Sequence, residues 1–439
     1  MGFKAFHLHP DIETGIEAMG YTEPTPIQKE CIPVVLQNHD VMGLAQTGTG
    51  KTAAFVLPIL QRLKSGPRKC IRALIIAPTR ELAEQIHEHA MQLGRRAKIK
   101  SLTVYGGVGK NPQITKLRSG AEIVVACPGR LLDLMNQGEI DLSRVEVLVL
   151  DEADRMFDMG FLPDVRKIVR KLPTKRQTLL FSATMPEDIR QLAQEVLQNP
   201  LTIRIDDTVP LATVSHALYP VEPHRKTALL MKLLDRTDTE SVLVFTRTKH
   251  RATRLAQQIQ KAGYPAASLQ GDLPQNKRQA ALNGFRDGKY RIMVATDIAA
   301  RGIDVSGISH VINYDMPDTA DAYTHRIGRT GRAAKTGDAF TFVTREDRAF
   351  VWTIEKALGE AIERRTLEDF DYTTPPPAGS GFDRLRKTGG GAAMHRTVDS
   401  MPAMAAAASP WGGSRDFSRK ATKIFSSSNL RSRRSRGGR

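Results

Sequence analysis

The sequence is poor in cysteine and contains no long hydrophobic run. Its 439 residues include only three cysteines, and their wide spacing forms no disulfide or zinc-binding pattern. No stretch approaches the ~18 consecutive apolar residues that a transmembrane helix needs. The first ten residues lack the apolar core of a secretory signal peptide. These absences argue against a disulfide-rich secreted protein and a membrane protein, and we expect a cytoplasmic one.

Negative charge is also scarce. The chain carries 64 Lys and Arg against 47 Asp and Glu, a net charge of +17, which predicts a polyanionic partner such as nucleic acid or an anionic membrane. Residues 371–439 concentrate this excess, with 13 basic and only 4 acidic residues. Because this end is also rich in Pro, Gly and Ala, it has too little apolar area to offset chain entropy. We predict a disordered Arg-rich tail over 371–439.

The rest of the chain alternates short apolar runs with amphipathic segments of helix length. This alternation is typical of α/β domains whose parallel sheets are covered on both faces. The strand-like runs form two series, at 73–77, 123–126, 145–150 and 178–181, and at 241–245, 291–295, 311–313 and 339–343. A polar, proline-containing stretch at 206–215 separates them. The sequence therefore predicts two tandem α/β domains, over 1–208 and 215–370.

A phosphate-binding loop is the strongest local motif. Residues 45–52, AQTGTGKT, lie between an apolar run and a helix-like segment, as phosphate loops do. Ala45 replaces the glycine with which the usual motif begins. Glycines let backbone N–H groups turn toward phosphates, and a helix N-terminus adds positive potential. Lys51 would reach the β- and γ-phosphates, and the Thr52 hydroxyl would be a Mg²⁺ ligand. The predicted nucleotide-binding residues are Ala45, Gln46, Thr47, Gly48, Thr49, Gly50, Lys51 and Thr52.

An acidic cluster, Asp151-Glu152-Ala153-Asp154, follows the apolar run 145–150. Ligand sites in open parallel sheets lie at the carboxyl ends of strands, so this cluster should face the same edge as the phosphate loop. Acidic clusters are commonly solvated turns, but the upstream phosphate loop favours nucleotide hydrolysis. Asp151 is then the candidate that holds Mg²⁺ through water, and Glu152 the candidate that orients the attacking water.

The sequence HRIGRTGR at 325–332 is unusually rich in arginine. By itself this segment would indicate a surface patch or a nucleic-acid contact. With a nucleotide site in the first domain, Arg329 and Arg332 become candidate arginine fingers, because residues three apart share one face of a helix. Fingers on a second domain would make hydrolysis depend on domain closure.

Together these motifs resemble, in order and over about residues 3–370, the DEAD-box RNA helicases. The wording VLVFTRTK at 242–249 is most similar to the bacterial RhlE-type branch. The resemblance implies two RecA-like domains, with ATP and Mg²⁺ as cofactors. It also implies RNA-stimulated ATP hydrolysis coupled to domain closure, local unwinding of short duplexes and remodelling of RNA–protein complexes.

The resemblance assigns further residues. Residues 20–28 are similar to the adenine-reading Q motif, so Gln28 would bind the adenine edge, Phe3 would stack on the ring, and Tyr21 would contribute to the same site. Asp304 would lie near the ribose. The implied coupling residues are Asp154, Ser182, Thr184 and His325. The implied RNA-binding residues are Pro78, Arg80, Gly107, Gly129, Arg130, Arg247, Gly271, Asp272, Gln275, Arg278 and Thr296.

The chain departs from the family pattern at Cys127, where threonine is usual. A thiol is a poor hydrogen-bond donor, so we expect only a backbone contact there. Two other functions stay open: an RNA-binding or annealing protein that acts through its basic tail, and a DNA helicase. The ATP motifs disfavour the first and the motif wording disfavours the second. We expect structured or duplex RNA as partner, with little sequence specificity, in ribosome assembly or RNA decay. A membrane is not expected, because the tail lacks an amphipathic anchor.

Overall fold

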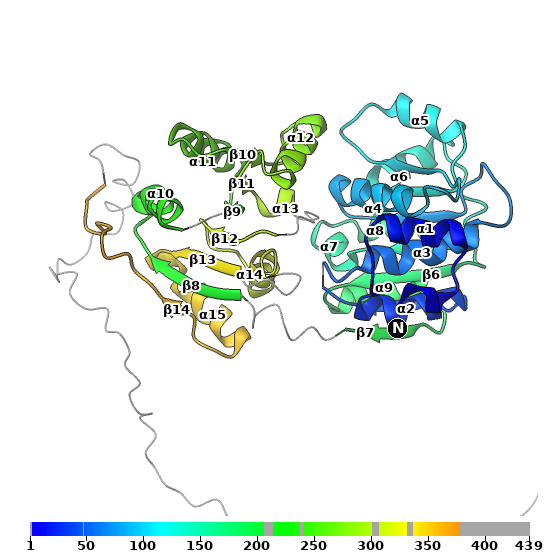
Figure 1. The fold of residues 1–439 in the computed structure, drawn as a ribbon, viewed down its shortest axis with the longest axis horizontal. Helices are drawn as coiled ribbons and strands as arrows, with labels where there is room; N and C mark the ends of the chain where they lie inside the picture. The colour runs from blue at the N-terminus through cyan, green and yellow to red at the C-terminus, as the bar shows by residue number, and fades with distance from the viewer. Residues whose placement is uncertain are drawn as a thin grey trace, which may run out of the picture. The chain divides into compact units, whose positions relative to one another are not determined.

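Two seven-stranded parallel sheets organise the chain (Figure 1). The computed structural model describes residues 2–46, 48–205, 214–237, 240–300, 307–331 and 337–376. Residues Met1–Pro375 make one compact unit that contains both sheets. The α/β prediction with two parallel sheets is confirmed. Of the tail predicted over 371–439, all but residues 371–376 lies outside the described residues.

The first sheet has the strand order β3-β4-β2-β5-β6-β1-β7. Its strands are β1 Val41–Leu44, β2 Ala73–Ile76, β3 Ser101–Val104, β4 Ile123–Ala126, β5 Val147–Leu150, β6 Gln177–Ser182 and β7 Leu201–Arg204. Its helices are η1 Phe3–Phe6, α1 Pro10–Ala18, α2 Pro26–Leu36, α3 Lys51–Leu63, α4 Arg80–Leu93, α5 Lys110–Arg118, α6 Pro128–Asn136, α7 Ala153–Asp158, α8 Leu162–Val169 and α9 Glu187–Val196.

The second sheet has the strand order β10-β11-β9-β12-β13-β8-β14. Its strands are β8 Val214–Pro220, β9 Val242–Phe245, β10 Ala266–Leu269, β11 Ile292–Ala295, β12 His310–Asn313, β13 Gly337–Val343 and β14 Glu363–Arg364. Its helices are η2 Pro223–Arg225, α10 Lys226–Arg236, α11 Lys249–Lys261, α12 Gln275–Arg286, α13 Asp297–Ala300, α14 Ala320–Ile327, η3 Arg345–Asp347 and α15 Arg348–Leu358.

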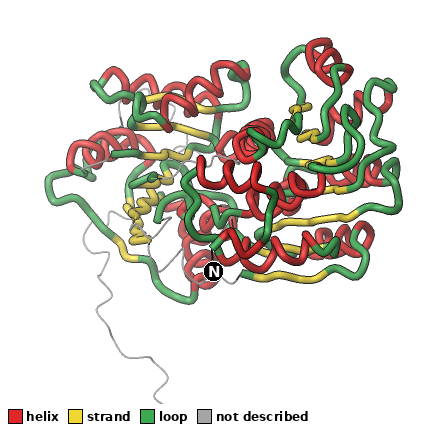
Figure 2. The backbone as a smooth tube through the Cα atoms, turned by 45° about the vertical axis from the view of Figure 1, so that its right-hand side comes forward, coloured by secondary structure: helices red, strands yellow, loops and turns green. Residues whose placement is uncertain are grey.

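Each sheet is covered by helices on both faces, as Figure 2 shows by the helices that flank the strands. Alternate residues of one strand therefore enter different cores: Ile75 packs in the cluster that contains Phe55, and Leu74 packs in the cluster that contains Met156. Burial on both faces explains why the central strands are continuous apolar runs. No helix of the described residues is long and apolar enough to span a membrane.

The strand order places the candidate site. Strands β5, β6 and β1 are neighbours in the first sheet, and all run parallel. Leu44, at the end of β1, pairs with Ser182, at the end of β6. Because parallel strands end at one edge, the phosphate loop after β1 lies beside the residues that end or follow β5 and β6.

Candidate active site

The phosphate loop is curled between β1 and α3. Lys51 begins α3 and is buried, and its Nζ donates to the carbonyl oxygen of Ala45 at 2.8 Å. The Thr49 hydroxyl donates to the Gln46 carbonyl oxygen, also at 2.8 Å. Among the described residues, the loop's polar side chains therefore bond mainly to its own backbone.

The loop ends at the N-terminus of α3. Gly48 and Gly50 have φ of 90° and 92°, a left-handed backbone that glycine adopts without a steric penalty. The first turn of α3, which includes Thr52, contains no acidic residue. This helix end can therefore attract an anion through its free N–H groups and its dipole.

Gln28 joins the Q-motif segment to the phosphate loop. Its side chain is buried; Nε2 donates to the Gly50 carbonyl oxygen at 3.0 Å, and Oε1 accepts from the Thr25 backbone N–H at 3.0 Å. A Cβ at Gly50 would lie 2.5 Å from Gln28 Nε2. The glutamine and the loop therefore fit together only because residue 50 has no side chain.

Phe3 and Tyr21 stack on each other, with ring centroids 6.0 Å apart and an interplanar angle of 22°. Phe3 is buried, and Phe6 contacts it edge-on. In this structure the Phe3 ring is thus part of an aromatic cluster. Its contact with adenine stays a prediction.

The two carboxylates of the predicted hydrolytic site, Asp151 and Glu152, follow β5 and are both buried. Burial raises the pKa of Asp151 to about 6, although the nearby charge of Lys51 lowers it. Glu152 has a left-handed backbone, with φ of 54° and ψ of 52°. Its Oε2 accepts from Arg155 Nη1 at 2.7 Å, whereas its buried Oε1 has no hydrogen-bond partner among the described residues.

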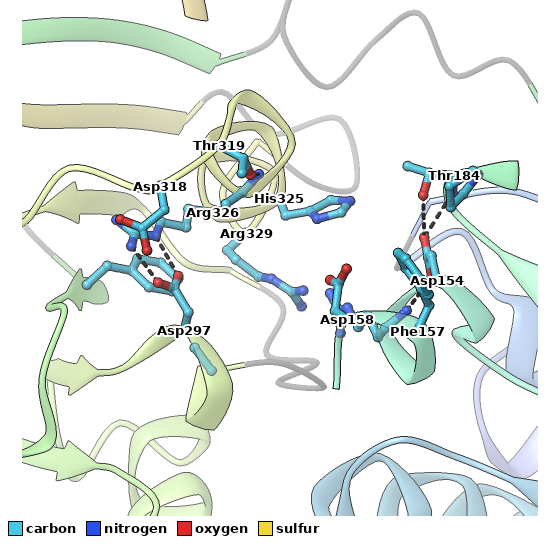
Figure 3. Close-up of a pocket in the computed structure, with 15 residues that line it drawn as sticks. Asp154, Phe157, Asp158, Thr184, Asp297, Asp318, Thr319, His325, Arg326 and Arg329 are labelled. Atoms are coloured by element: carbon cyan, nitrogen blue, oxygen red, sulfur yellow. Dashed lines mark hydrogen bonds and ion pairs between the residues drawn. The ribbon is translucent and has the colours of Figure 1, made fainter. Parts of the chain in front are cut away.

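Asp154 connects the acidic cluster to the segment that ends β6. Its Oδ2 accepts from the backbone N–H of Ala183 at 3.0 Å. It also accepts from the backbone N–H and the hydroxyl of Thr184, at 2.9 and 3.2 Å (Figure 3). The Ser182 hydroxyl accepts from the Asp154 backbone N–H and donates to the Thr184 carbonyl oxygen. The structure thus brings together Asp154, Ser182 and Thr184, three of the four predicted coupling residues.

Hydrogen bonds hold the arginine-rich segment, of which the structure describes residues 325–331, to the half of the molecule that contains the second sheet. Arg326, on α14, donates twice to the carboxylate of Asp297, at 2.6 Å each (Figure 3). It also bonds the Asn313 side chain and the Asp315 carbonyl oxygen. Arg329 follows α14 and is buried. A pocket is lined by Arg329, His325 and Arg326 together with Asp154, Arg155 and Thr184 of the first half.

The first half's candidate RNA-binding residues lie where helices begin. Arg80 begins α4, and its guanidinium fills the space that a Cβ at Gly107 would occupy. Gly129 lies in the first turn of α6, and nothing lies within 4 Å of the position that a Cβ would take there, so a phosphate could approach. Pro78 immediately precedes Thr79, the N-cap of α4.

Arg130 and Cys127 lie in the same segment around the start of α6. The Arg130 guanidinium donates to the Val108 carbonyl oxygen, at 3.2 and 3.3 Å. Cys127 caps α6 without a side-chain hydrogen bond, and burial raises the pKa of its thiol to about 12. The neutral, buried thiol is consistent with a backbone role alone.

The second half's candidates surround the ends of β9, β10 and β11. The backbone N–H of Arg247 donates to Asp315 Oδ2 at 2.9 Å, and Asp272 pairs with Lys249 at 2.5 Å. Thr296 follows β11, and nothing would contact a Cβ at Gly271 within 4 Å.

Gln275 and Arg278, on the first two turns of α12, share one acceptor. Both donate to Glu81 Oε1 of α4, at 3.2 and 2.7 Å. Arg278 also donates to the Gln270 carbonyl oxygen. Glu81, on the first half's α4, therefore binds two candidate RNA-binding residues of the second half. Thr47, Asp304 and Arg332 lie outside the described residues.

Comparison with known proteins identifies the family. Residues 25–192 match the model of the DEAD/DEAH box helicase family, and residues 225–334 match that of the helicase conserved C-terminal domain. The DEAD-box ATP-dependent RNA helicase CshA of Bacillus subtilis is 41% identical over 387 residues, which are 88% of this chain and 78% of that protein. This chain belongs to the DEAD-box helicase family.

Further relatives support the same assignment. CshA of Geobacillus kaustophilus is 43% identical over 82% of this chain and 78% of its own length. Among solved structures, S. cerevisiae Dbp5 bound to RNA and ADP BeF3 has a TM-score of 0.74 at 32% identity, covering 88% of this chain and 98% of that chain. The expected pair of RecA-like domains is confirmed. The narrower RhlE-type assignment stays a prediction.

The donor set of this DEAD-box site fits a magnesium–nucleotide complex. Thr52 and Asp151 offer a hydroxyl and a carboxylate, which are hard oxygen ligands. The described part of the chain has no group of three His, Cys, Asp or Glu able to hold a metal ion alone. Mg²⁺ usually keeps several waters and is held by few protein oxygens plus substrate phosphates, so this sparse set is suitable.

Four residues at the site were not predicted from the sequence: Arg155, Asp297, Asp315 and Arg326. Arg326 lies in the HRIGRTGR segment, and Asp297 directly follows the predicted residue Thr296, so the opposite charges of the two side chains could have indicated their pairing. Arg155 stands three residues after Glu152, a spacing that brings side chains together on a helix. Nothing local marks Asp315. It follows β12 and accepts from Arg247 and Arg251, which follow the neighbouring strand β9.

Proposed function

We infer that this chain is an ATP-dependent RNA helicase that couples RNA-stimulated ATP hydrolysis to closure of its two domains. The observation that carries this is the juxtaposition, at one sheet edge, of the phosphate loop after β1, Asp151 and Glu152 after β5, and Ser182 ending β6. The membership of the DEAD-box family and the likeness to an RNA-bound helicase structure support it.

ATP would occupy the phosphate loop. Lys51 exchanges its bond to Ala45 for the β- and γ-phosphates, and Gln28, with Phe3 and Tyr21 nearby, reads the adenine. Thr52 and, through water, Asp151 would hold Mg²⁺, which neutralises phosphate charge when bound. Glu152 orients a water for in-line attack on the γ-phosphorus; the bond to the β-phosphate oxygen breaks, and ADP and phosphate leave.

The second domain completes the site on closure. Arg329 and Arg332 would stabilise the charge of the transferring phosphoryl group, and Asp304 would contact the ribose. RNA bridges the same two domains, so ATP and RNA each favour the closed state and each raises the affinity for the other. Asp154, Ser182, Thr184 and His325 would transmit closure between the ATP and RNA sites. The hydrogen bonds from Ala183 and Thr184 to Asp154 support this route.

RNA would be held mainly through its phosphates and 2′-hydroxyls, with little dependence on sequence. The helix N-termini at Arg80 and Gly129, and the open backbone at Gly271, favour such contacts. We propose the domain bounds 1–208 and 215–370. The basic tail over 371–439 would raise the local RNA concentration. The protein would act in the cytoplasm on structured RNA in ribosome assembly or RNA decay.

The decisive variant is Glu152→Gln. It should still bind ATP and RNA, because the amide preserves the side-chain shape, but RNA-stimulated turnover should fall about 10²–10⁴-fold. Phosphate release and RNA binding by fluorescence anisotropy measure the two properties. Near-native turnover would refute the role of Glu152.

The alternative, an annealing protein that acts through the tail, makes a different prediction for strand separation. Unwinding of a short RNA duplex should require ATP and fail with ADP or without nucleotide. If strand exchange were equal in all three conditions and lost on removal of residues 371–439, the annealing function would replace the helicase.

A further inference from the structure

Arg155 is a buried cation next to the residue proposed to orient the attacking water. The side chains of Arg155 and Glu152 are only 6% and 4% exposed, and Nη1 lies 2.7 Å from Oε2. Arg155 also borders the pocket that contains Arg329. A buried ion pair contributes little net stability compared with apolar residues of similar size, so stability alone is a weak reason for this pair.

The two oxygens of Glu152 differ. Oε2 is held by Arg155, whereas Oε1 is buried without a hydrogen-bond partner among the described residues. A buried acceptor without a partner has a desolvation cost, so its position indicates a partner that arrives with the substrate. The left-handed backbone of Glu152 is a strained conformation for a residue with a side chain, and such strain is found at functional sites.

The anchor of Arg155 is rigid. Its backbone N–H donates to Asp154 Oδ1 at 3.0 Å, and Asp154 Oδ2 is held by Ala183 and Thr184. The guanidinium is planar and always charged, so it holds a carboxylate oxygen in a defined direction. The end of β6 therefore sets the position of Arg155, and Arg155 sets that of Glu152.

We propose that Arg155 is a positioning residue for hydrolysis: it fixes Oε2 of Glu152 and leaves Oε1 as the acceptor for the attacking water. This inference rests on the proposed function. It adds a link between the coupling segment, Ser182–Thr184, and the water-orienting carboxylate. Movement of that segment on RNA binding would reach Glu152 through Arg155.

The test uses Arg155→Met, which keeps most of the side-chain volume and removes the guanidinium. The kcat for ATP should fall about 10²-fold, the size expected for a misplaced catalytic group, with KM for ATP changed less than about threefold. Arg155→Lys should recover part of kcat. Arg166→Met is the matched control, because Arg166 on α8 pairs with Glu195 at 2.8 Å on the surface; its kinetics should be unchanged.

A double-mutant cycle separates positioning from a structural effect. If Arg155 acts through Glu152, single-turnover rates of Glu152→Gln and of Glu152→Gln with Arg155→Met should agree within about twofold. Multiplicative losses, or a raised KM with unchanged kcat, would overturn the proposal. If Glu152→Gln itself kept native turnover, the proposed function would fail instead. If Arg155→Met does not fold, the same cycle is run with Arg155→Lys. A fully native kcat for Arg155→Lys would refute the proposal. Multiplicative losses when Arg155→Lys is combined with Glu152→Gln would refute it as well.

Discussion

The two halves of the molecule share one strand order but use it for different chemistry. Numbered within each half, both sheets run third, fourth, second, fifth, sixth, first, seventh. A lysine begins the first α-helix after the first strand in each half: Lys51 on α3 and Lys226 on α10. An aspartate follows the fifth strand in each: Asp151 directly after β5, and Asp315 two residues after β12.

The difference lies in the turn after the first strand. In the first half this turn is the glycine-rich phosphate loop, and Lys51 has only a backbone carbonyl as its hydrogen-bond acceptor among the described residues. In the second half the turn is VEPHRK, without glycine. There Lys226 donates to the Tyr314 carbonyl oxygen at 2.9 Å and lies 3.6 Å from Asp315, which also binds Arg251. The same positions form the candidate phosphate site in one half and an internal ion-pair network in the other.

Replacing each of the two lysines by alanine, in separate variants, should give the largest difference between the halves in ATP turnover and in stability. Lys51→Ala would remove the proposed cation for the β- and γ-phosphates, so ATP turnover should fall about 10²–10³-fold. It also removes one buried hydrogen bond, to the Ala45 carbonyl oxygen, which should lower the free energy of unfolding by only about 1–2 kcal/mol. Lys226→Ala removes a buried charged hydrogen bond, and the free energy of unfolding should fall by about 2–3 kcal/mol while ATP binding persists. Denaturant melts and ATPase rates measure both, and equal ATPase losses would break the comparison.

Two glycines with left-handed backbones test the loop more finely. Gly50→Ala should add strain of about 1–2 kcal/mol and push against Gln28, weakening ATP binding about tenfold. Gly263, after α11, has φ of 94° with open space around it. Gly263→Ala should therefore add the backbone strain without a clash and leave ATP binding unchanged. Calorimetric ATP titrations that gave the same affinity for both variants would contradict the close fit of Gln28.

The smallest effect concerns pH. Because burial raises the pKa of Asp151 from 3.8 to about 6, the folded, nucleotide-free chain takes up a proton that the unfolded chain does not hold between those values. This carboxyl therefore makes the free energy of unfolding fall as pH rises from about 4 to about 6. Asp151→Asn should remove that contribution. Denaturant melts between about pH 4 and about pH 6 measure this. If the free energy of unfolding of the native protein and of Asp151→Asn changed equally with pH, Asp151 would not lie in a desolvated site.

The central part of each sheet was predictable from the sequence, and its margins were not. Strands at 73–77, 123–126 and 291–295 were predicted within one residue, because burial on both faces requires continuous apolar residues. The outermost strands β3, β7, β10 and β14, and the strand β8 beside β14, were not predicted. β7 shows why: three of its four residues are exposed, so no apolar run marks it.

The sequence by itself determined the ATP motifs, the α/β alternation and the excess of positive charge, because each is a local pattern of residue types. Only the tertiary structure decided which polar groups meet. Three contacts illustrate this: Arg155 binds one oxygen of Glu152, Gln28 contacts Gly50, and Asp315 accepts from or pairs with several cationic side chains. The contacts of Gln28 and Asp315 join residues far apart in the chain, which a local pattern does not encode. The Arg155–Glu152 pair is local in the sequence, but which oxygen of Glu152 it holds depends on the backbone geometry there.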